Sequence, residues 1–222
     1  MSVPTPRRPA AVLFDCDGVL ANSEGLVNRL VAADLTARGW PMSPAEAREA
    51  FLGMALPDMV PMVAARLAGL PADWGHALSV VIAAALVAEV EAVPGARDAV
   101  RAVAASGIPV AVVSNSSRSE LAAKLARLEL ASLFAGRAFS FEDVARPKPA
   151  PDLYQAAARA CGADPADCVV VEDSLLGARA GLAAGCRVLG LTLETDAAVF
   201  LAIGAEPFAA MADLPALLGV AG

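Results

Sequence analysis

Two aspartates separated by one residue follow an apolar run near the start of the sequence. The run Ala10–Phe14 leads into Asp15, Cys16 and Asp17, and Gly18 comes next. An apolar run that ends in a polar turn containing glycine predicts a buried strand followed by a loop. Because alternate residues of a strand share a face, Asp15 and Asp17 can address one site while Cys16 points away. Two acids at a buried strand end are costly unless a cation or a reaction uses them.

Polar residues of other kinds follow two more apolar runs. Ser114–Ser117 comes after Val110–Val113, Glu172–Ser174 comes after Cys168–Val171, and Lys148 lies in a loop rich in proline. Neighbouring parallel strands bring such ends together at the sheet edge where α/β proteins bind ligands. Carboxylates suit a hard cation such as Mg²⁺, whereas hydroxyl, amide, lysine and helix N-termini suit a phosphate. With a carboxylate nucleophile, these groups can transfer a phosphoryl group through an aspartyl-phosphate.

The elements that must position these residues fall into two patterns. From Asn22 to Glu91 the pattern is helical, with no convincing strand. Helices are predicted over 23–39, from the capping box at Ser43–Glu46 onward, and over 56–67 and 73–90. From Ala96 onward helices (96–105, 118–129, 151–161, 175–184) alternate with strands (110–113, 138–140, 168–171, 187–191). This alternation predicts a doubly wound parallel α/β sheet. Residues 1–21 and 93–222 would form the α/β core, and residues 22–92 a small helical domain inserted after the first strand.

Composition and charge exclude several classes of protein. The 222 residues are 57% hydrophobic and carry a net charge of −7, which argues against long-range attraction of nucleic acid. The most apolar stretch, Ala77–Ala88, is shorter than the roughly 20 residues of a membrane span. Residues 1–9 lack the apolar segment of a signal peptide. Four cysteines without metal-binding spacing indicate reduced thiols, so we expect a cytoplasmic protein. We also expect a monomer or weak homo-oligomer, but no feature of the sequence fixes the oligomeric state.

Four motifs, taken in order, resemble those of the haloacid dehalogenase (HAD) superfamily. They are Asp15–Leu20 (DCDGVL), Ser114–Ser116 (SNS), the Lys-Pro of Arg146–Asp152 (RPKPAPD), and Val171–Ser174 (VEDS). Each motif is weak alone, but four in order with sensible spacing are specific. The resemblance implies a Rossmann-like core, and the helical insert is similar to the small cap domain of β-phosphoglucomutase-like phosphatases.

The resemblance also implies roles for individual residues. Asp15 would be the nucleophile, and Asp17 the general acid and then the base that activates water. A Mg²⁺ ion would be held by Asp15, the backbone carbonyl of Asp17, Asp173 and, directly or through water, Glu172. The phosphoryl oxygens would be bound by Ser114, Asn115, Ser116 and Lys148. Ser23, Gly53 and Leu56 would line the substrate side away from the phosphate.

Differences between this sequence and the motifs of related HAD enzymes distinguish between the possible activities. Dehalogenases lack the second aspartate, so Asp17 argues against that reaction. Phosphonoacetaldehyde hydrolases use a cap lysine, and residues 22–91 contain none. β-Phosphoglucomutase typically has a cap arginine and a histidine where this chain has Leu56 and Val27. The expected activity is therefore hydrolysis of a small phosphate monoester, such as a sugar phosphate or related metabolite. A mutase-like phosphoryl transferase is the alternative, and a phospho-accepting regulatory protein is a weaker one.

Other conspicuous residues have ordinary structural explanations. Lys124 is expected to be a surface charge on its helix, and His76 a residue of the insert's surface or of a helix start. Ser116 and Ser117 are expected to cap a helix, because no histidine lies nearby in the sequence to activate them. Trp40 and Trp74 are expected to pack the insert.

Overall fold

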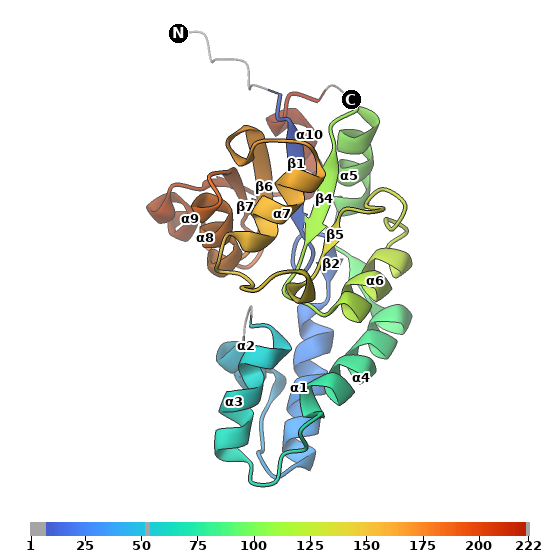
Figure 1. The fold of residues 1–222 in the computed structure, drawn as a ribbon, viewed down its shortest axis with the longest axis vertical. Helices are drawn as coiled ribbons and strands as arrows, with labels where there is room; N and C mark the ends of the chain where they lie inside the picture. Colours follow the sequence, from blue (N-terminus) through green and yellow to red (C-terminus); the bar gives the residue numbers. More distant parts are fainter. Residues whose placement is uncertain (1–7, 52–53, 221–222) are drawn as a thin grey trace.

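A parallel sheet with helices on both faces carries a separate group of helices at one end (Figure 1). The computed structural model describes residues 8–51 and 54–220. Within this part of the chain the main sheet has six strands in the order β5-β4-β1-β6-β7-β8. Their bounds are β1 Ala11–Asp15, β4 Val110–Val113, β5 Ala138–Phe139, β6 Cys168–Glu172, β7 Arg187–Leu191 and β8 Glu206–Phe208. The predicted doubly wound fold is confirmed.

The central strand β1 lies between two strands that come much later in the chain. It pairs in parallel with β4 on one side, where Asp15 lies opposite Val113, and with β6 on the other. The chain therefore builds the sheet outward from β1 in both directions. In such sheets ligands bind where the strand order reverses, outside the carboxyl ends of the strands. Asp15, the last residue of β1, stands at that point.

Helices cover both faces of the sheet because its central strands β1, β4 and β6 are buried along their whole length. In β1, Val12 and Phe14 face one hydrophobic cluster, and Ala11 and Leu13 face another. Helices α5 and α6 contribute to the first cluster, and α7, α8 and α9 to the second. The bounds on this part of the chain are α5 Ala96–Ala105, α6 Arg118–Arg127, α7 Asp152–Ala160, α8 Leu175–Ala183, α9 Ala197–Ile203 and α10 Leu214–Leu217.

Four helices between β1 and α5 form a group of their own, which we call the four-helix segment (residues 24–89). They are α1 Glu24–Ala37, α2 Pro44–Phe51, α3 Leu56–Arg66 and α4 Trp74–Glu89. The predicted capping box starts α2, since Glu46 accepts from the backbone N–H of Ser43 at 2.7 Å and Ser43 Oγ accepts from that of Glu46 at 3.2 Å. Trp74 is buried, Trp40 packs edge-on against Phe51, and His76 is exposed on α4, as expected.

Two short strands connect the four-helix segment to the rest of the chain. Strand β2 (Ala21–Asn22) pairs antiparallel with β3 (Glu91–Ala92). The sequence predicted no strand here, because two residues are too few to show a periodic pattern. A second junction lies along α4, which packs against α6 of the α/β core (Figure 1). The first hydrophobic cluster runs through this junction and contains residues of both parts.

Two further results complete the fold. Helices α9 and α10 and strand β8 lie beyond Leu191, where the sequence analysis assigned no element. Among the residues that the structure describes, no helix combines the length and apolar character that crossing a membrane requires.

Candidate active site

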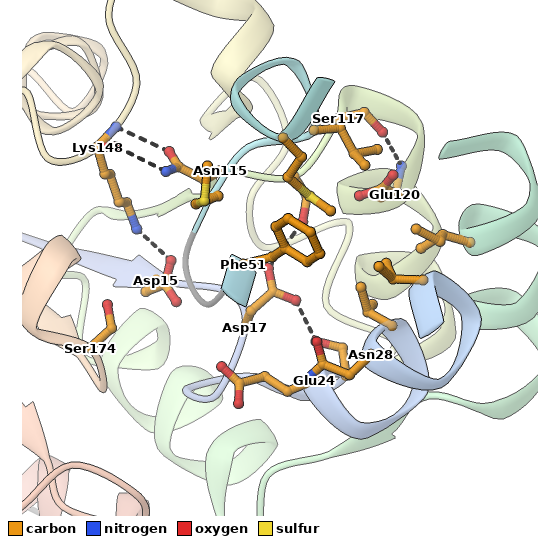
Figure 2. A pocket seen from close by; sticks show the side chains of 18 of the residues that line it. Asp15, Asp17, Glu24, Asn28, Phe51, Asn115, Ser117, Glu120, Lys148 and Ser174 are labelled. Carbon is orange, nitrogen blue, oxygen red and sulfur yellow. Dashed lines mark hydrogen bonds and ion pairs between the residues drawn. The ribbon is translucent and has the colours of Figure 1, made fainter. Parts of the chain in front are cut away.

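The carboxyl ends of β1, β4 and β6 meet at one edge of the sheet, and the loop before α7 joins them. They bring Asp15, Asp17, Asn115, Ser116, Lys148 and Asp173 together around one cavity, and Ser114 and Glu172 contact these residues from behind its lining. Figure 2 shows Asp15, Asp17, Asn115 and Lys148 in this arrangement. Parallel pairing places these strand ends side by side, so residues about 100 and 155 positions apart become neighbours. The sequence prediction that these side chains share one site therefore agrees with their placement.

Three carboxylates form a buried acidic cluster. One oxygen each from Asp15, Glu172 and Asp173 lies within 4.8 Å of the others, and all three residues are buried. Burial and the Glu172 charge raise the pKa of Asp15 to about 8, although Lys148 opposes the shift. Burial and the neighbouring charges of Asp15 and Glu172 also raise the pKa of Asp173 well above its ordinary value. Three acids so close together cannot all ionise at low cost unless a cation joins them.

Glycines allow the close approach that this cluster requires. Gly18 has a φ of +76°, and a Cβ there would lie 1.9 Å from an Asp173 oxygen. A Cβ at Gly177 would lie 1.7 Å from a Glu172 oxygen. Ser174 caps α8 by accepting from the backbone N–H of Gly177, which fixes the start of that helix beside Glu172. The turn after β1 and the start of α8 can therefore press directly against the acids.

Lys148 lies between two of the acids. Its ammonium group donates to Asp15, to Glu172 at 2.8 Å and to the carbonyl of Val113 at 3.2 Å. These carboxylates outweigh the effect of burial and hold the pKa of Lys148 above its ordinary value. Tyr154, which the sequence analysis did not single out, donates to the same Glu172 oxygen at 2.7 Å. Lys148 is therefore a fixed positive charge beside Asp15.

The side chain of Asn115 holds the Lys148 loop in place. Its amide nitrogen donates to the Lys148 carbonyl at 3.1 Å, and its oxygen accepts from the Lys148 N–H at 3.1 Å. This paired contact joins the end of β4 to the loop before α7. Binding of phosphate by Asn115 stays a prediction, but its side chain has a positioning role that the sequence did not indicate.

Asp17 faces a different set of partners from Asp15. One of its oxygens accepts from Ser23 and Lys124, and the other accepts from Ser114 at 3.0 Å and from Ser116 at 3.1 Å. Burial alone would raise the pKa of Asp17, but Lys124 and the hydroxyl donors lower it to about 2. The two aspartates thus have opposite pKa shifts, which suits separate chemical roles.

The expectation that Lys124 is a surface charge is wrong. Its side chain is 1% exposed, and its ammonium group contacts Asp17 and donates to Ser116 at 2.6 Å. The Asp17 charge outweighs burial and keeps the pKa of Lys124 above its ordinary value. The spacing of apolar residues could have indicated that Lys124 is buried. Lys124 lies three residues after Leu121 and four before Leu128, and both leucines are buried.

The two serines before α6 have different roles. Ser117 caps the helix by accepting from the backbone N–H of Glu120 at 3.3 Å, as expected. Ser116 does not cap it, because its hydroxyl donates to Asp17 and accepts from Lys124. The prediction that Ser116 caps the helix is therefore wrong, because its hydroxyl is bound to Asp17 and Lys124 instead.

A cavity of about 140 Å³ lies between the strand ends and the four-helix segment. Ser23 and Leu56 both line it. Ser23 also donates to Asp17, so its side chain lies beside the end of β1, and contact of either residue with the substrate stays a prediction. Gly53, also predicted to line the substrate side, falls outside the described residues. Glu120, which the sequence analysis passed over, also lines the cavity and accepts from Ser79 of α4 at 2.6 Å.

Comparisons with known proteins agree with the motifs and the geometry. A family model for haloacid dehalogenase-like hydrolases matches residues 9–185. The 6-phosphogluconate phosphatase of Escherichia coli (strain K12) is 32% identical over 82% of this chain and 81% of that enzyme. Hexitol phosphatase A of the same strain is 34% identical over 83% of each chain.

A solved structure extends the similarity to nearly the whole chain. A HAD family hydrolase from Deinococcus radiodurans R1, with bound phosphate and sodium, has a TM-score of 0.75 and is 35% identical. The match covers 96% of this chain and 97% of that one. The ordered motifs, the sheet topology and the family match together show that this chain belongs to the haloacid dehalogenase-like hydrolases.

Proposed function

We propose that the protein is a Mg²⁺-dependent phosphatase that hydrolyses a small phosphate monoester through an aspartyl-phosphate on Asp15. The observation that carries the proposal is the pair at the end of β1. Asp15 belongs to the acidic cluster and contacts Lys148, whereas Asp17 contacts Lys124 and three serine hydroxyls. Relatives named as phosphatases match most of the chain, which supports this class of reaction.

The donor set fits a hard divalent cation. The candidate ligands are carboxylate oxygens of Asp15, Glu172 and Asp173, with the Asp17 carbonyl as the fourth ligand that the family resemblance implies. All-oxygen sites favour Mg²⁺ over softer metals. The pKa values of Asp15 and Asp173 stay raised although Lys148 lies nearby, so this one ammonium group does not balance the three carboxylates. When bound, the cation would neutralise charge on the phosphoryl oxygens and keep Asp15 ionised.

The chain's own residues would carry out two displacements. A carboxylate oxygen of Asp15 attacks phosphorus, the ester P–O bond breaks, and the leaving alkoxide takes a proton from Asp17. Water then attacks the phosphoryl group on Asp15 while Asp17 takes its proton back, which releases inorganic phosphate and free Asp15. Lys148 and the hydroxyls of Ser114 and Ser116 stabilise the phosphoryl oxygens. Asp17 is ionised in the resting site, so it must take up this proton from solvent before the first displacement. Protonation becomes easier when the hydroxyls of Ser114 and Ser116 turn to phosphate, because Asp17 then loses two donors that favour its ionised form.

The four-helix segment would act as a cap over this site, with residues 22–92 as the inserted domain and 1–21 and 93–222 as the core. It lines the cavity opposite the strand ends, and two connections attach it to the core. Movement about these connections would admit substrate and then exclude water. Four free thiols, one of them the buried Cys16 between the two aspartates, favour a reducing compartment such as the cytoplasm.

None of the described residues that line the cavity favours the mutase alternative. A mutase that holds a bisphosphate by its far end needs a cation there, and Leu56 lines this cavity where that family typically has arginine. A phospho-accepting regulatory role is also disfavoured, because Asp17 is placed to speed loss of the phosphoryl group. Phosphatase activity is therefore the function that the site supports best.

Substitution of the nucleophile tests the proposal directly. With p-nitrophenyl phosphate and Mg²⁺, we expect steady phosphate release by the wild type and none by Asp15→Asn, because an amide is too weak a nucleophile. Asp98→Asn, the same change at an exposed position on α5, is the matched control and should leave activity unchanged.

Two further measurements separate the nucleophile from the metal. Acid quenching during turnover, followed by mass spectrometry, should find the phosphoryl group on the peptide that contains Asp15. EDTA should abolish release, and added Mg²⁺ should restore it. Activity of Asp15→Asn at the wild-type level would refute the nucleophile, and full activity in EDTA would refute the metal.

A further inference from the structure

The two walls of the cavity differ in chemistry. The strand ends and the loops after them provide charged and hydrogen-bonding groups, including Asp15, Asp17 and Lys148 (Figure 2). The opposite wall comes from all four helices of the four-helix segment and the turn before α3. Its apolar side chains are Val27 and Val31 of α1, Phe51 of α2, Met54, Leu56 and Met59 at α3, and Ile82 of α4.

Among the described residues of that wall, none offers a free positive charge to a second anionic group. The two lysines that line the cavity, Lys124 and Lys148, already bind carboxylates of the core. None of the described lining residues is an arginine. Three arginines of the described four-helix segment have partners away from the cavity: Arg29 with Glu89, Arg38 with Asp34, and Arg66 over the Trp40 ring. The fourth, Arg48, does not line the cavity and is already paired with two acids, Glu194 and the lining residue Glu24.

The remaining polar groups on this side are few. On this side Ser23 donates to Asp17, Glu24 is an acid paired with Arg48, and Asn28 of α1 offers one neutral amide. A second acid, Glu120, lines the cavity from α6 of the core. A second phosphate or a carboxylate on the substrate would lose its hydration here without gaining a cation. A chain of hydroxyls would lie against Val, Met and Phe side chains, where it finds few hydrogen-bond partners. An apolar body would gain from burial against the same side chains.

We propose that the substrate is the phosphate monoester of a compact, uncharged and predominantly apolar alcohol, bound with its apolar body against the helical wall. This inference rests on the proposed phosphatase function and narrows its substrate class. Asn28 can bind one additional hydroxyl or carbonyl group. The polyol and sugar-acid phosphates in the names of the two bacterial relatives are therefore poor substrates for this chain.

Three phosphate esters of four-carbon alcohols test this preference, because they share one chain length and differ in the polarity and charge of the alcohol. They are n-butyl phosphate, erythritol 4-phosphate and 4-(phosphonooxy)butanoate, each a primary ester. With Mg²⁺, we expect kcat/KM for butyl phosphate to exceed that for either polar ester by at least about tenfold, because each polar group that the apolar wall leaves unpaired costs about 1–3 kcal/mol. Between ethyl and butyl phosphate, kcat/KM should rise about fourfold per methylene group.

A charge placed on the apolar wall tests which residues set this preference. In Leu56→Arg, kcat/KM for 4-(phosphonooxy)butanoate relative to butyl phosphate should rise at least about tenfold, since a guanidinium can pair with the carboxylate. Met62→Arg adds the same charge to the same helix at an exposed position that does not line the cavity, and should leave that ratio unchanged.

The outcomes separate the two proposals. Release from p-nitrophenyl phosphate together with a preference for erythritol 4-phosphate or 4-(phosphonooxy)butanoate would overturn the substrate class and leave the phosphatase standing. No release from any ester, p-nitrophenyl phosphate included, would refute the phosphatase and the substrate class with it. If Leu56→Arg does not fold, the ranking of the esters by the wild type still decides.

Discussion

The residue with the most unusual surroundings is Asp17, whose two oxygens accept from one ammonium and three hydroxyl groups. The four donors come from three places: Ser23 from the start of the four-helix segment, Ser114 and Ser116 from the loop after β4, and Lys124 from α6. This network ties the loop after β1 to three other elements. It holds Asp17 ionised and away from the acidic cluster of Asp15, Glu172 and Asp173.

Removing the buried lysine alone should destabilise the protein. Lys124→Met leaves the Asp17 charge without its cation, and we expect a loss of about 3 kcal/mol in the free energy of unfolding, the low end for broken buried pairs because the Asp17 side chain is 28% exposed. The double variant Lys124→Met/Asp17→Asn removes both charges and should recover part of that loss. Urea denaturation of the two variants and of Asp17→Asn measures the coupling between the residues.

The size of the effect distinguishes a buried pair from a surface charge. A loss below about 0.5 kcal/mol in Lys124→Met would match an ordinary surface substitution and contradict the pairing. Equal losses in the single and double variants would show that the methionine itself, rather than the unpaired Asp17, causes the damage.

Residues differ in how far the sequence could place them. Asp15, Lys148, Glu172 and Asp173 stand at strand ends or in a distinctive loop, so motif and topology together predict their meeting. The burial of Lys124 was harder to predict from the sequence, because a lysine on an amphipathic helix is almost always exposed. Its position on the buried face has meaning only once a partner in another element is known.

At the scale of elements, α8 carries a glycine where helices usually favour alanine. Gly177→Ala would ordinarily stabilise a helix by up to about 1 kcal/mol. Here a Cβ would lie 1.7 Å from a Glu172 oxygen, so the carboxylate must leave its contacts with Lys148 and Tyr154. We expect Gly177→Ala to lose both stability and at least about tenfold in phosphate release, which urea denaturation and the p-nitrophenyl phosphate assay measure.

Gly25 of α1 provides the control for this change. No atom lies within 4 Å of the Cβ that Gly25→Ala would add, so that variant should be as stable as the wild type or more so, with unchanged activity. If Gly177→Ala instead matched Gly25→Ala in stability and in phosphate release, close packing of α8 against Glu172 would contribute to neither.

The elements themselves were predicted best where apolar runs are long and bounded by glycine or proline. Strands β4 and β7 and helix α5 have the predicted bounds, and most other helices differ by one or two residues. Strand β8 was missed because it has three residues, one of them Pro207, and no apolar run of its own. Its place is set by pairing with β7, which is tertiary information that a single short segment cannot carry.

At the scale of the whole molecule, the α/β core and the four-helix segment share one hydrophobic cluster. The cluster joins Phe14 of β1 to Leu86 of α4 through the packing of α4 against α6, and the buried hydroxyl of Ser79 adds hydrogen bonds to Ser117 and Glu120 across the same junction. A shared core of this kind couples the stability of the two parts. We therefore expect them to unfold together, even if the cap proposed here moves during catalysis.

A single substitution in α4 tests this coupling, because both tryptophans of the chain, Trp40 and Trp74, lie in the four-helix segment and report on it alone. Leu86 is fully buried, so Leu86→Ala should cost about 2–5 kcal/mol, whereas its exposed neighbour Val87→Ala should change stability by less than about 0.5 kcal/mol. Tryptophan fluorescence and hydrogen exchange of the β1 amides should report the same loss in Leu86→Ala. A loss of stability that tryptophan fluorescence detects but hydrogen exchange of the β1 amides does not would mean that the four-helix segment unfolds independently. The cluster through α4 and α6 would then transmit no stability to the sheet that carries Asp15.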